Sequence, residues 1–490
     1  MTYKLREHQS RAIAKLRESI GKGKRCPVLM ASTGFGKTLI AIDMIKSALN
    51  KGNKVMFVVD RVTLIDQTSK EFDKHGIDHG IIQADHWRTN DLPVQIASVQ
   101  TLVRRRDKPY ANLVIVDEAH CMWQGMNEII KNWTGVKFIG LSATPFAKGM
   151  GKVFDDLIQV ETTQSLIDKG YLSDFIAYGS VELNLDGIQV QAGDYNQKQL
   201  GQRVNTKKLV GDVVKTWLKK GENRKTVCFA TNVAHSKSIV DEFNAYGVTA
   251  EHIDAKTKPE DRDAILMRHD SGETKIISNV GITTKGWDSP DTSCIILARP
   301  TKSLMLYLQM VGRVLRTHPD KQNAIILDHG RNIERLGFPT DPLPDYLCDG
   351  EKDTQQKKKK EEREREEKAP KPCPACNFLK TSFKCPSCGH EPMIKPEVES
   401  TDHELKVIER HSMESKQHWY SMFMQHARQK GYNPGWVAHK YREKFGVWPK
   451  GLAKIPASTT PEFKKYIQHL NIKRAKMKDI RKLKNSWRTA

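Results

Sequence analysis

The feature that most constrains this chain is a repeated alternation of short apolar runs with longer amphipathic stretches. One series of runs lies between residues 28 and 143, and a second with the same rhythm lies between residues 227 and 328. Short runs rich in β-branched residues, separated by helical segments, are typical of parallel sheets covered on both faces. We therefore predict two α/β domains in tandem, with a less regular join near residues 151–205. The runs are Val28–Ser32, Val55–Asp60, Val94–Val99, Leu113–Asp117, Phe138–Ser142, Val227–Thr231, Lys275–Asn279, Cys294–Leu297 and Ala324–Asp328.

Composition favours a soluble protein with a polyanionic partner. In 490 residues, 80 Lys and Arg against 58 Asp and Glu leave a formal charge of +22. The chain has no apolar stretch near the roughly 18 residues of a membrane span, and its first residues lack the apolar core of a signal peptide. We therefore expect neither secretion nor membrane insertion. Nucleic acid is the simplest polyanion, although charge alone also fits a basic protein that only stays soluble.

The regular pattern ends after residue 347. A mixed-charge run at residues 357–368 has no apolar stripe and indicates a linker or solvated helix. Residues 395–490 hold 21 Lys and Arg against 9 Asp and Glu, so more than half of the net charge lies in about a fifth of the chain. We predict domains at 1–160 and 161–347, a charged linker at 348–370, a zinc ribbon at 371–394 and a basic, aromatic-rich helical region at 395–490.

A phosphate-binding loop is predicted at residues 31–38, Ala-Ser-Thr-Gly-Phe-Gly-Lys-Thr, between an apolar run and an amphipathic helix at 39–49. Backbone N–H groups at Gly34 and Gly36 and the helix N-terminus would cradle the phosphates of ATP. Lys37 would reach the β- and γ-phosphate oxygens, and the Thr38 hydroxyl would ligate Mg²⁺. Ala31 replaces the usual first glycine of such a loop. Alone, the loop could also be an unrelated glycine-rich turn.

Two carboxylates support the same site. Asp117-Glu-Ala-His120 follows an apolar run, which places Asp117 and Glu118 at the carboxyl end of a strand, where ligands of parallel sheets gather. We assign metal coordination to Asp117 and activation of the attacking water to Glu118. An acidic turn after a strand is the alternative, and the combination with Lys37 argues against it.

Phosphoryl transfer also needs positive charge near the γ-phosphate. Arg313 and Arg316, in the run Gln309-Met-Val-Gly-Arg-Val-Leu-Arg316, are our candidates for arginine fingers from the second α/β domain. If this segment is helical, the two arginines lie on one face of it, and exposed arginines of an ordinary helix are the alternative. A site divided between two domains would close only around ATP, which would give a motor stroke.

The complete set of motifs resembles the superfamily 2 helicases of the DEAH-box type, from about residue 5 to residue 330. That resemblance implies two tandem RecA-like P-loop domains, nucleic-acid-dependent ATP hydrolysis and helicase activity. The chain is most similar to RadD-type bacterial repair helicases and their phage-encoded relatives, although RadD has cysteine where Ala119 stands. The matching segments are Leu5–Gln9, the phosphate loop, Val59–Gln67, Ser98–Leu102, Asp117–His120, Ser142–Thr144, Asn279–Pro290 and Gln309–Arg316, and for the RadD group Thr283–Pro290, Arg299–Thr301 and Tyr307–Arg313.

The resemblance implies further roles. The adenine would be recognised by Arg6 and Gln9, with Tyr3 as a stacking partner, and Gln309 would act in catalysis. Domain motion would be coupled to hydrolysis by Ser142, Thr144 and His120, while Gly286 and Asp288 would lie between ATP and the nucleic acid. Backbone-phosphate contacts are expected from Arg61, Thr101 and Thr231. For the serines and threonines, helix capping is the ordinary alternative.

Four clustered cysteines predict a metal site. Cys373-Pro-Ala-Cys376 and Cys385-Pro-Ser-Cys388 can each form a tight knuckle, and four thiolates without an open position favour structural Zn²⁺. A redox dithiol is the alternative. The other five cysteines are scattered, so the distribution indicates a reducing compartment rather than a disulfide framework.

Aromatic and basic residues alternate in the C-terminal region. These aromatics suit either stacking on single-stranded bases or the core of a small helical domain, and we favour the core for most of them. Residues 473–488 would form a basic helix or arm along phosphates. The aromatics are Trp419, Phe423, Trp436, Tyr441, Phe445 and Trp448.

We therefore predict an ATP hydrolase that acts as a helicase or translocase in the cytoplasm of a bacterium or phage-infected cell. DNA is the favoured partner, single-stranded or branched, including R-loop and recombination intermediates of replication and repair, alongside proteins such as a single-strand-binding protein. The alternatives are an RNA helicase, the motor subunit of a restriction complex, and a non-enzymatic clamp. Intact Lys37, Glu118 and Arg313 argue against the clamp.

Overall fold

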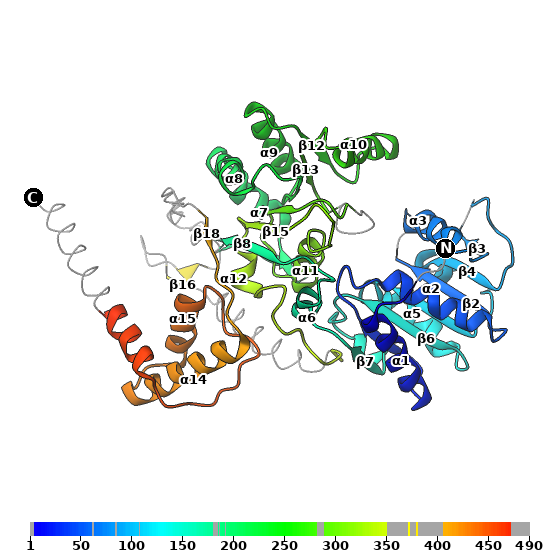
Figure 1. Ribbon diagram of the computed structural model, residues 1–490, viewed down its shortest axis with the longest axis horizontal. Coiled ribbons are helices and arrows are strands. Elements are labelled where there is room, and N and C mark those ends of the chain that lie inside the picture. Colours follow the sequence, from blue (N-terminus) through cyan, green and yellow to red (C-terminus); the bar gives the residue numbers. More distant parts are fainter. Residues whose placement is uncertain are drawn as a thin grey trace, which may run out of the picture.

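The protein was analysed as a computed structural model. It forms two α/β domains and a C-terminal helical module, which follow one another along the long axis of the molecule (Figure 1). No described helix combines the length and apolarity needed to cross a bilayer. The described residues are 4–60, 63–83, 86–106, 108–179, 185, 187–191, 193–281, 289–349, 371–372, 379–380 and 405–471.

The first domain is built on a seven-stranded parallel sheet. Its strand order is β3-β4-β2-β5-β6-β1-β7, so β1 lies between β6 and β7, and the carboxyl ends of all strands share one edge. The strands are β1 (Pro27–Met30), β2 (Val55–Val59), β3 (Gly80–Ile82), β4 (Val94–Ser98), β5 (Leu113–Asp117), β6 (Lys137–Ser142) and β7 (Asp156–Gln159).

Alternating side chains of these strands enter two separate cores. In β2, Val55, Phe57 and Val59 pack with residues of α1–α3, whereas Met56 and Val58 pack with residues of α4 and α5. Helices therefore cover both faces, as the continuous apolar runs predict. The helices are α1 (Glu7–Gly21), α2 (Lys37–Leu49), α3 (Thr63–Lys74), α4 (Val99–Arg104), α5 (Ala119–Asn132) and the 3-10 turn η1 (Met150–Lys152).

The second domain repeats this plan with the order β12-β13-β11-β14-β15-β8-β18. Six strands are parallel, and the short β18 pairs antiparallel with β8 at the edge. The strands are β8 (Phe175–Gly179), β11 (Thr226–Phe229), β12 (Ala250–Ile253), β13 (Ile276–Asn279), β14 (Cys294–Leu297), β15 (Ala324–Asp328) and β18 (Lys406–Val407), with the two-residue pairs β9 (Val190–Gln191) and β10 (Asp194–Tyr195), and β16 (Lys371–Pro372) and β17 (Leu379–Lys380).

Helices again cover both faces of this sheet. Cys294 and Ile296 of β14 pack with α8 and α9, whereas Ile295 and Leu297 face the core that holds α11 and α12. The helices are α6 (Thr163–Asp168), α7 (Gln197–Val204), α8 (Lys207–Lys220), α9 (Val233–Ala245), α10 (Pro259–Ser271), α11 (Leu304–Val311) and α12 (Asn332–Leu336).

The C-terminal module is a helical unit that continues the second domain's core. It contains α14 (Met413–Lys430), α15 (Pro434–Phe445) and a helix at 461–471. Its core aromatics belong to the same cluster of buried residues as α11 and α12. Lys416 Nζ donates to Asp341 at 2.8 Å, Arg442 to Glu334 at 2.7 Å and Arg410 to Asp174 at 2.7 Å. Because β18 also completes the sheet, this module is a packed part of the second domain rather than a loose tail.

Most of the architecture agrees with the sequence prediction, and each of the nine apolar runs contains a strand. The predicted helix at 39–49 begins two residues earlier, at Lys37. The core interpretation of the C-terminal aromatics is confirmed for Trp419, Phe423, Tyr441 and Phe445, which are buried, while Trp436 and Trp448 are half-buried. The charged run at 357–368 and the basic stretch 473–488 lie outside the described residues.

Candidate nucleotide site between the two domains

The phosphate loop connects β1 to α2 at the carboxyl edge of the first sheet. Gly34 and Gly36 both have positive φ angles, 86° and 87°, a conformation that residues with a Cβ rarely adopt. A Cβ on Gly36 would lie 2.1 Å from Gln9 Nε2, and one on Gly34 would lie 2.6 Å from Leu172 Cδ2. The loop therefore needs glycine at both positions, and its N–H groups and the start of α2 are suited to bind phosphate.

Two residues of the N-terminal segment contact this loop. Gln9 Nε2 donates to the Phe35 carbonyl at 3.1 Å, and His8 Nε2 lies 3.2 Å from the same oxygen. The Arg6 guanidinium lies over the Tyr171 ring, 4.9 Å from its centroid, and both residues line the cavity described below. The structure thus places Gln9 against the loop and Arg6 in the lining of the cavity beside it. Tyr171 was not predicted, because it belongs to the irregular join and no motif marks it, and Tyr3 lies outside the described residues.

The carboxylates of β5 face the loop. Lys37 Nζ lies 3.0 Å from Glu118 Oε1, and the two side chains are only 17% and 19% exposed. Glu118 begins α5 with φ 47° and ψ 48°, the left-handed region, which costs a residue with a side chain about 1–3 kcal/mol. Backbone strain of this kind is concentrated at functional sites. The surrounding structure therefore keeps Glu118 in a backbone conformation that the residue itself disfavours.

Asp117 has a pKa well above its ordinary value. Burial, with the Glu118 charge as the next cause, raises the pKa of Asp117 to about 6, although Lys37 opposes the shift. Asp117 Oδ1 and Ser32 Oγ are both buried without a hydrogen-bond partner. Orphaned oxygens beside the Thr38 hydroxyl are the donor set that Mg²⁺ prefers. The residues present therefore fit an Mg²⁺ ion with its nucleotide.

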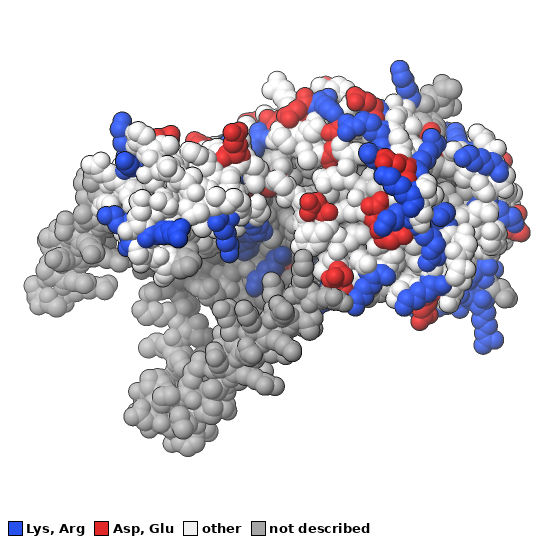
Figure 2. Space-filling model, turned by 90° about the horizontal axis from the view of Figure 1, so that it is seen from below, with Lys and Arg blue, Asp and Glu red and all other residues white. Residues whose placement is uncertain are grey.

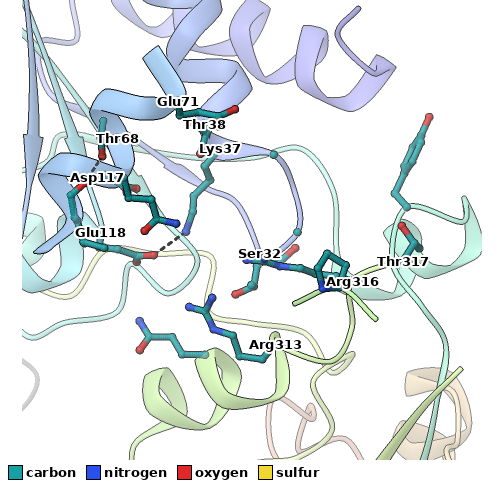
Figure 3. A pocket seen from close by; sticks show the side chains of 18 of the residues that line it. Ser32, Lys37, Thr38, Thr68, Glu71, Asp117, Glu118, Arg313, Arg316 and Thr317 are labelled. Atoms are coloured by element: carbon teal, nitrogen blue, oxygen red, sulfur yellow. Dashed lines mark hydrogen bonds and ion pairs between the residues drawn. The ribbon is translucent and has the colours of Figure 1, made fainter. Parts of the chain in front are cut away.

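These groups line a cavity of about 560 Å³ between the two domains. Figure 3 shows Arg313 and Arg316 on one side of the cavity, with Lys37, Asp117 and Glu118 on the other. Burial lowers the pKa of Arg313 to about 10, opposed by the Glu118 charge, and burial also lowers the pKa of Arg316. The second domain thus places two partly buried cations beside the phosphate loop of the first.

The two arginines do not lie in a helix, so the one-face arrangement that a helix would give does not apply. Helix α11 ends at Val311, and Arg313 and Arg316 lie in the turn that follows. Gly312 is the residue at the helix end, and a Cβ there would approach Thr33 of the phosphate loop to 2.5 Å. The close approach of the two domains therefore coincides with the end of the helix, and the arginines reach the cavity from an irregular segment.

A chain of hydrogen bonds joins three of the predicted coupling and catalytic residues. His120 Nδ1 lies 2.8 Å from Ser142 Oγ, and His120 Nε2 lies 3.1 Å from Gln309 Nε2 of the second domain. His120 Nδ1 is also 3.3 Å from Glu118 Oε2. The Thr144 N–H donates to Ser142 Oγ at 3.0 Å, which attaches Thr144 to the same chain. One histidine thus contacts the carboxylate, the end of β6 and the second domain.

The residues predicted to contact nucleic acid are less well placed for that role than the residues of the nucleotide cavity are for theirs. Thr101 lies in the first turn of α4, where its N–H donates to the hydroxyl of the N-cap residue Ser98 at 3.2 Å and its own hydroxyl accepts from Ser98 Oγ at 2.9 Å. Thr231 is 2% exposed and its hydroxyl lies 3.5 Å from the Ala298 carbonyl, so in this conformation it cannot reach a phosphate. Arg61, Gly286 and Asp288 lie outside the described residues.

The predicted zinc ligands also lie outside the described residues. These are Cys373, Cys376, Cys385 and Cys388. Among the residues that are described, no group of three or more His, Cys, Asp or Glu is arranged to hold a metal. Zinc therefore stays a prediction from the spacing of the four cysteines.

Comparison with known protein families places two matches on the two α/β domains. Residues 2–147 match the family described as the res subunit of type III restriction enzymes, and residues 208–318 match the helicase conserved C-terminal domain. A solved fragment of the HsdR subunit of a type I restriction enzyme from Vibrio vulnificus YJ016 shares the fold, with a TM-score of 0.55, 20% identity and coverage of 70% of this chain and 68% of that one.

Three relatives extend the comparison. A 51.5 kDa protein of a Lactococcus phage is 30% identical over 79% of this chain and 84% of its own length. The ATP-dependent helicase IRC3 of Saccharomyces cerevisiae is 31% identical over 66% of this chain and 51% of its own length, so the chain spans about half of that relative. The ATP-dependent DNA helicase uvsW of phage T4 is 23% identical over 63% of this chain and 66% of its own length. The restriction-subunit match is followed along the chain by the helicase C-terminal match, so the chain has both domains of a helicase motor. It belongs to the ATP-dependent helicases of superfamily 2.

Proposed function

We propose that this protein is a DNA helicase or translocase that acts on branched, R-loop or recombination intermediates in replication or repair. The observation that carries the proposal is the cavity between the two domains, where Lys37, Asp117 and Glu118 of one domain face Arg313 and Arg316 of the other. A site completed by both domains couples ATP turnover to their relative motion. DNA is favoured because a DNA helicase is among the relatives, and the RadD-type resemblance supports repair.

The residues of the cavity have separable roles in hydrolysis. Gly34, Gly36 and Lys37 bind the phosphates, Arg6 and Gln9 lie where an adenine would be recognised, and Thr38 with Asp117 would hold Mg²⁺, which neutralises phosphate charge. Lys37 is paired with Glu118 when no nucleotide is present. Phosphates would draw Lys37 away, and Glu118 would then be available to accept a proton from the attacking water. Arg313 and Arg316 would stabilise charge on the transferring phosphate.

The hydrogen-bond chain through His120 offers a route from hydrolysis to motion. His120 contacts the Glu118 carboxylate, Ser142 and Gln309, so a change in the charge near Glu118 reaches both domains through one imidazole. A proton delivered to Glu118 would weaken its attraction for His120 and alter the contact with Gln309. We infer that Ser142, Thr144 and His120 act together as the coupling group.

The C-terminal module would provide an accessory nucleic-acid surface. Residues 405–471 hold twelve Lys and Arg against four Asp and Glu, and Figure 2 shows Lys and Arg side chains spread over this part of the surface. Three rings lie close together near the start of α15: the Tyr432 and Trp436 centroids are 4.8 Å apart with the rings tilted by 34°, and the Trp436 and His426 centroids are 5.5 Å apart with a tilt of 31°. Tyr432 is 47% exposed, and Arg428 and Lys430 beside it are exposed. Exposed rings among cations suit stacking on single-stranded bases.

An unwinding assay tests the proposal. The full chain is mixed with ATP and labelled substrates of equal length: a forked DNA, an R-loop, a tailed DNA duplex and a tailed RNA duplex. Faster separation of the forked DNA or the R-loop than of the tailed duplexes supports the proposal, with Lys37→Ala as the inactive control. Separation of the RNA duplex alone would contradict it and favour an RNA helicase.

A second candidate is the motor subunit of a restriction complex. The match of residues 2–147 to a restriction-enzyme subunit family favours it. Such a motor would translocate along intact duplex DNA without separating strands. Displacement of a triplex-forming strand from duplex DNA, with no unwinding of forked DNA, would favour this candidate over the first.

A further inference from the structure

The segment that carries both arginines of the cavity, Gly312–Arg316, has no secondary structure to hold it. Helix α11 ends at Val311, and three N–H groups of the segment bond backwards: Gly312 to the Leu308 carbonyl, Arg313 to the Met310 carbonyl and Val314 to the Val311 carbonyl. Since no helical turn follows, the segment's own carbonyls need partners from elsewhere in the structure. Those partners decide where the guanidinium groups point.

The side chain of one lysine donates hydrogen bonds to two of these carbonyls. Lys321 Nζ donates to the Val314 carbonyl at 2.6 Å and to the Arg316 carbonyl at 2.9 Å. The intervening Leu315 carbonyl accepts from the Ser173 N–H at 2.8 Å, and the Ser173 hydroxyl donates to the Arg316 carbonyl at 2.9 Å. The backbone of the arginine segment is therefore fixed by Lys321 on one side and by Ser173, from the join between the domains, on the other.

The same ammonium contacts a second segment. Lys321 Nζ lies 2.9 Å from the Thr292 carbonyl and 3.3 Å from the Pro290 carbonyl. Pro290 lines the nucleotide cavity, whereas Lys321 does not. Residues 289–292 directly follow the motif in which the resemblance places Gly286 and Asp288, between ATP and the nucleic acid. Lys321 is thus a common point of attachment for the arginine segment and for the segment after that motif.

The chemistry of this contact suits a positioning role. Burial lowers the pKa of Lys321 to about 7, and the Asp291 charge opposes the shift. An ammonium removed from water is held by charge-assisted hydrogen bonds, which are stronger than neutral ones, and here four carbonyl dipoles converge on it. The three N–H donors of an ammonium can rotate to reach four carbonyls when one N–H is shared between two of them, whereas a planar guanidinium cannot adopt the same geometry.

We propose that Lys321 is a positioning residue for ATP hydrolysis, which holds the arginine segment against residues 289–292 so that Arg313 and Arg316 face the nucleotide. It acts through the backbone and does not touch the nucleotide itself. This inference rests on the proposed role of the two arginines and adds a physical link between them and the motif predicted to sense the nucleic acid.

The test compares Lys321→Met, which keeps the apolar stem but removes the donors, with Lys237→Met, a control at an exposed lysine of α9. Steady-state ATP hydrolysis gives kcat and KM, and a fluorescent non-hydrolysable ATP analogue reports binding. We expect kcat of Lys321→Met to fall by on the order of tenfold or more, since small misplacements of catalytic groups are costly. Analogue affinity should stay within about twofold, and Lys321→Arg should recover part of kcat because charge is retained.

Two results would overturn the proposal. The first is a kcat of Lys321→Met equal to that of Lys237→Met. The second is a parallel loss of kcat, analogue affinity and thermal stability, which would show a purely structural lysine. Should Lys321→Met not fold, Ser173→Ala removes one hydrogen bond to the same Arg316 carbonyl and should lower kcat less, again without loss of affinity. If nucleic acid does not change the ATP turnover of the wild type, the proposed function fails. The kcat of these variants without nucleic acid still tests the positioning role of Lys321.

Discussion

Neutralising Asp117 is expected to stabilise the nucleotide-free protein while abolishing its response to Mg·ATP. Burial and the neighbouring Glu118 raise the pKa of Asp117 from 3.8 to about 6. A carboxyl that binds its proton more tightly in the folded than in the unfolded chain is destabilising when ionised, by about 1.4 kcal/mol per pKa unit. At pH 8 the ionised side chain therefore costs up to about 3 kcal/mol, which Asp117→Asn removes.

The dependence on pH has a definite sign. Well below pH 3.8 the carboxyl is protonated in both states and the cost vanishes; the cost grows as the pH rises through 3.8 and is complete only above about pH 7. The stabilisation by Asp117→Asn should thus be greatest at pH 8 and fall to about a third near pH 4.5. For a domain of this size, about 3 kcal/mol corresponds to an increase in Tm of up to roughly 10 °C.

Differential scanning calorimetry of the full chain in EDTA measures this effect. Asp91→Asn, at an exposed carboxylate of the same domain, is the matched control and should stay within about 0.5 kcal/mol of the wild type. Added Mg·ATP analogue should raise the Tm of the wild type and leave that of Asp117→Asn unchanged. The reasoning is refuted if Asp117→Asn is no more stable than the wild type at pH 8, or if the analogue stabilises both proteins equally.

Other predictions follow from the same geometry. Lys37→Ala and Glu118→Gln should each reduce ATP turnover by on the order of a hundredfold or more, and only Glu118→Gln should retain nucleotide binding by equilibrium titration; near-normal turnover in either would contradict the site. Deleting residues 472–490, which hold eight Lys and Arg, should leave the packed module intact and flatten the salt dependence of DNA affinity; an unchanged slope would show that this stretch does not track phosphates. Metal analysis should find one Zn²⁺ per chain, lost in Cys373→Ser; no zinc would favour the redox alternative.

The strands were predictable because their evidence is local. Each central strand is buried on both faces, so an unbroken apolar run such as Leu113–Asp117 identifies it without tertiary information. The edge strands β3, β7, β12 and β18 and the neighbouring β8 were not predicted. The edge strands are short, and β7, β8 and β12 have partly exposed residues that dilute the apolar signal.

The residues of the candidate site also fall into two groups, those that a local motif identifies and those whose contacts depend on the packed structure. Lys37, Asp117 and Glu118 were predictable because each sits in a short motif at the end of a strand. The contact of His120 with Gln309 joins residues 189 positions apart, and its geometry required the packed domains. Lys321 was missed for another reason. Its partners are backbone carbonyls, which every residue has, so the amino-acid sequence gives no sign of the contact.

The C-terminal region shows how packing changes an interpretation based on charge. The sequence predicts a basic, aromatic-rich region, and burial confirms the core interpretation for some of its rings only. Phe423 and Tyr441 are buried in the core, whereas Tyr432 stays exposed beside Trp436. Since β18 and the Lys416–Asp341 ion pair attach the module to the second domain, removal of everything after residue 373 would also expose part of that domain.

The central claim is that both domains complete one ATPase site whose turnover responds to nucleic acid. Its most direct test is steady-state ATP hydrolysis by the full chain alone and with single-stranded DNA, forked DNA, duplex DNA or RNA, for the wild type and Arg316→Ala. We predict stimulation by single-stranded or forked DNA, and its loss in Arg316→Ala with nucleotide binding retained. Wild-type turnover that no nucleic acid changes, or full stimulation of Arg316→Ala, would contradict the account.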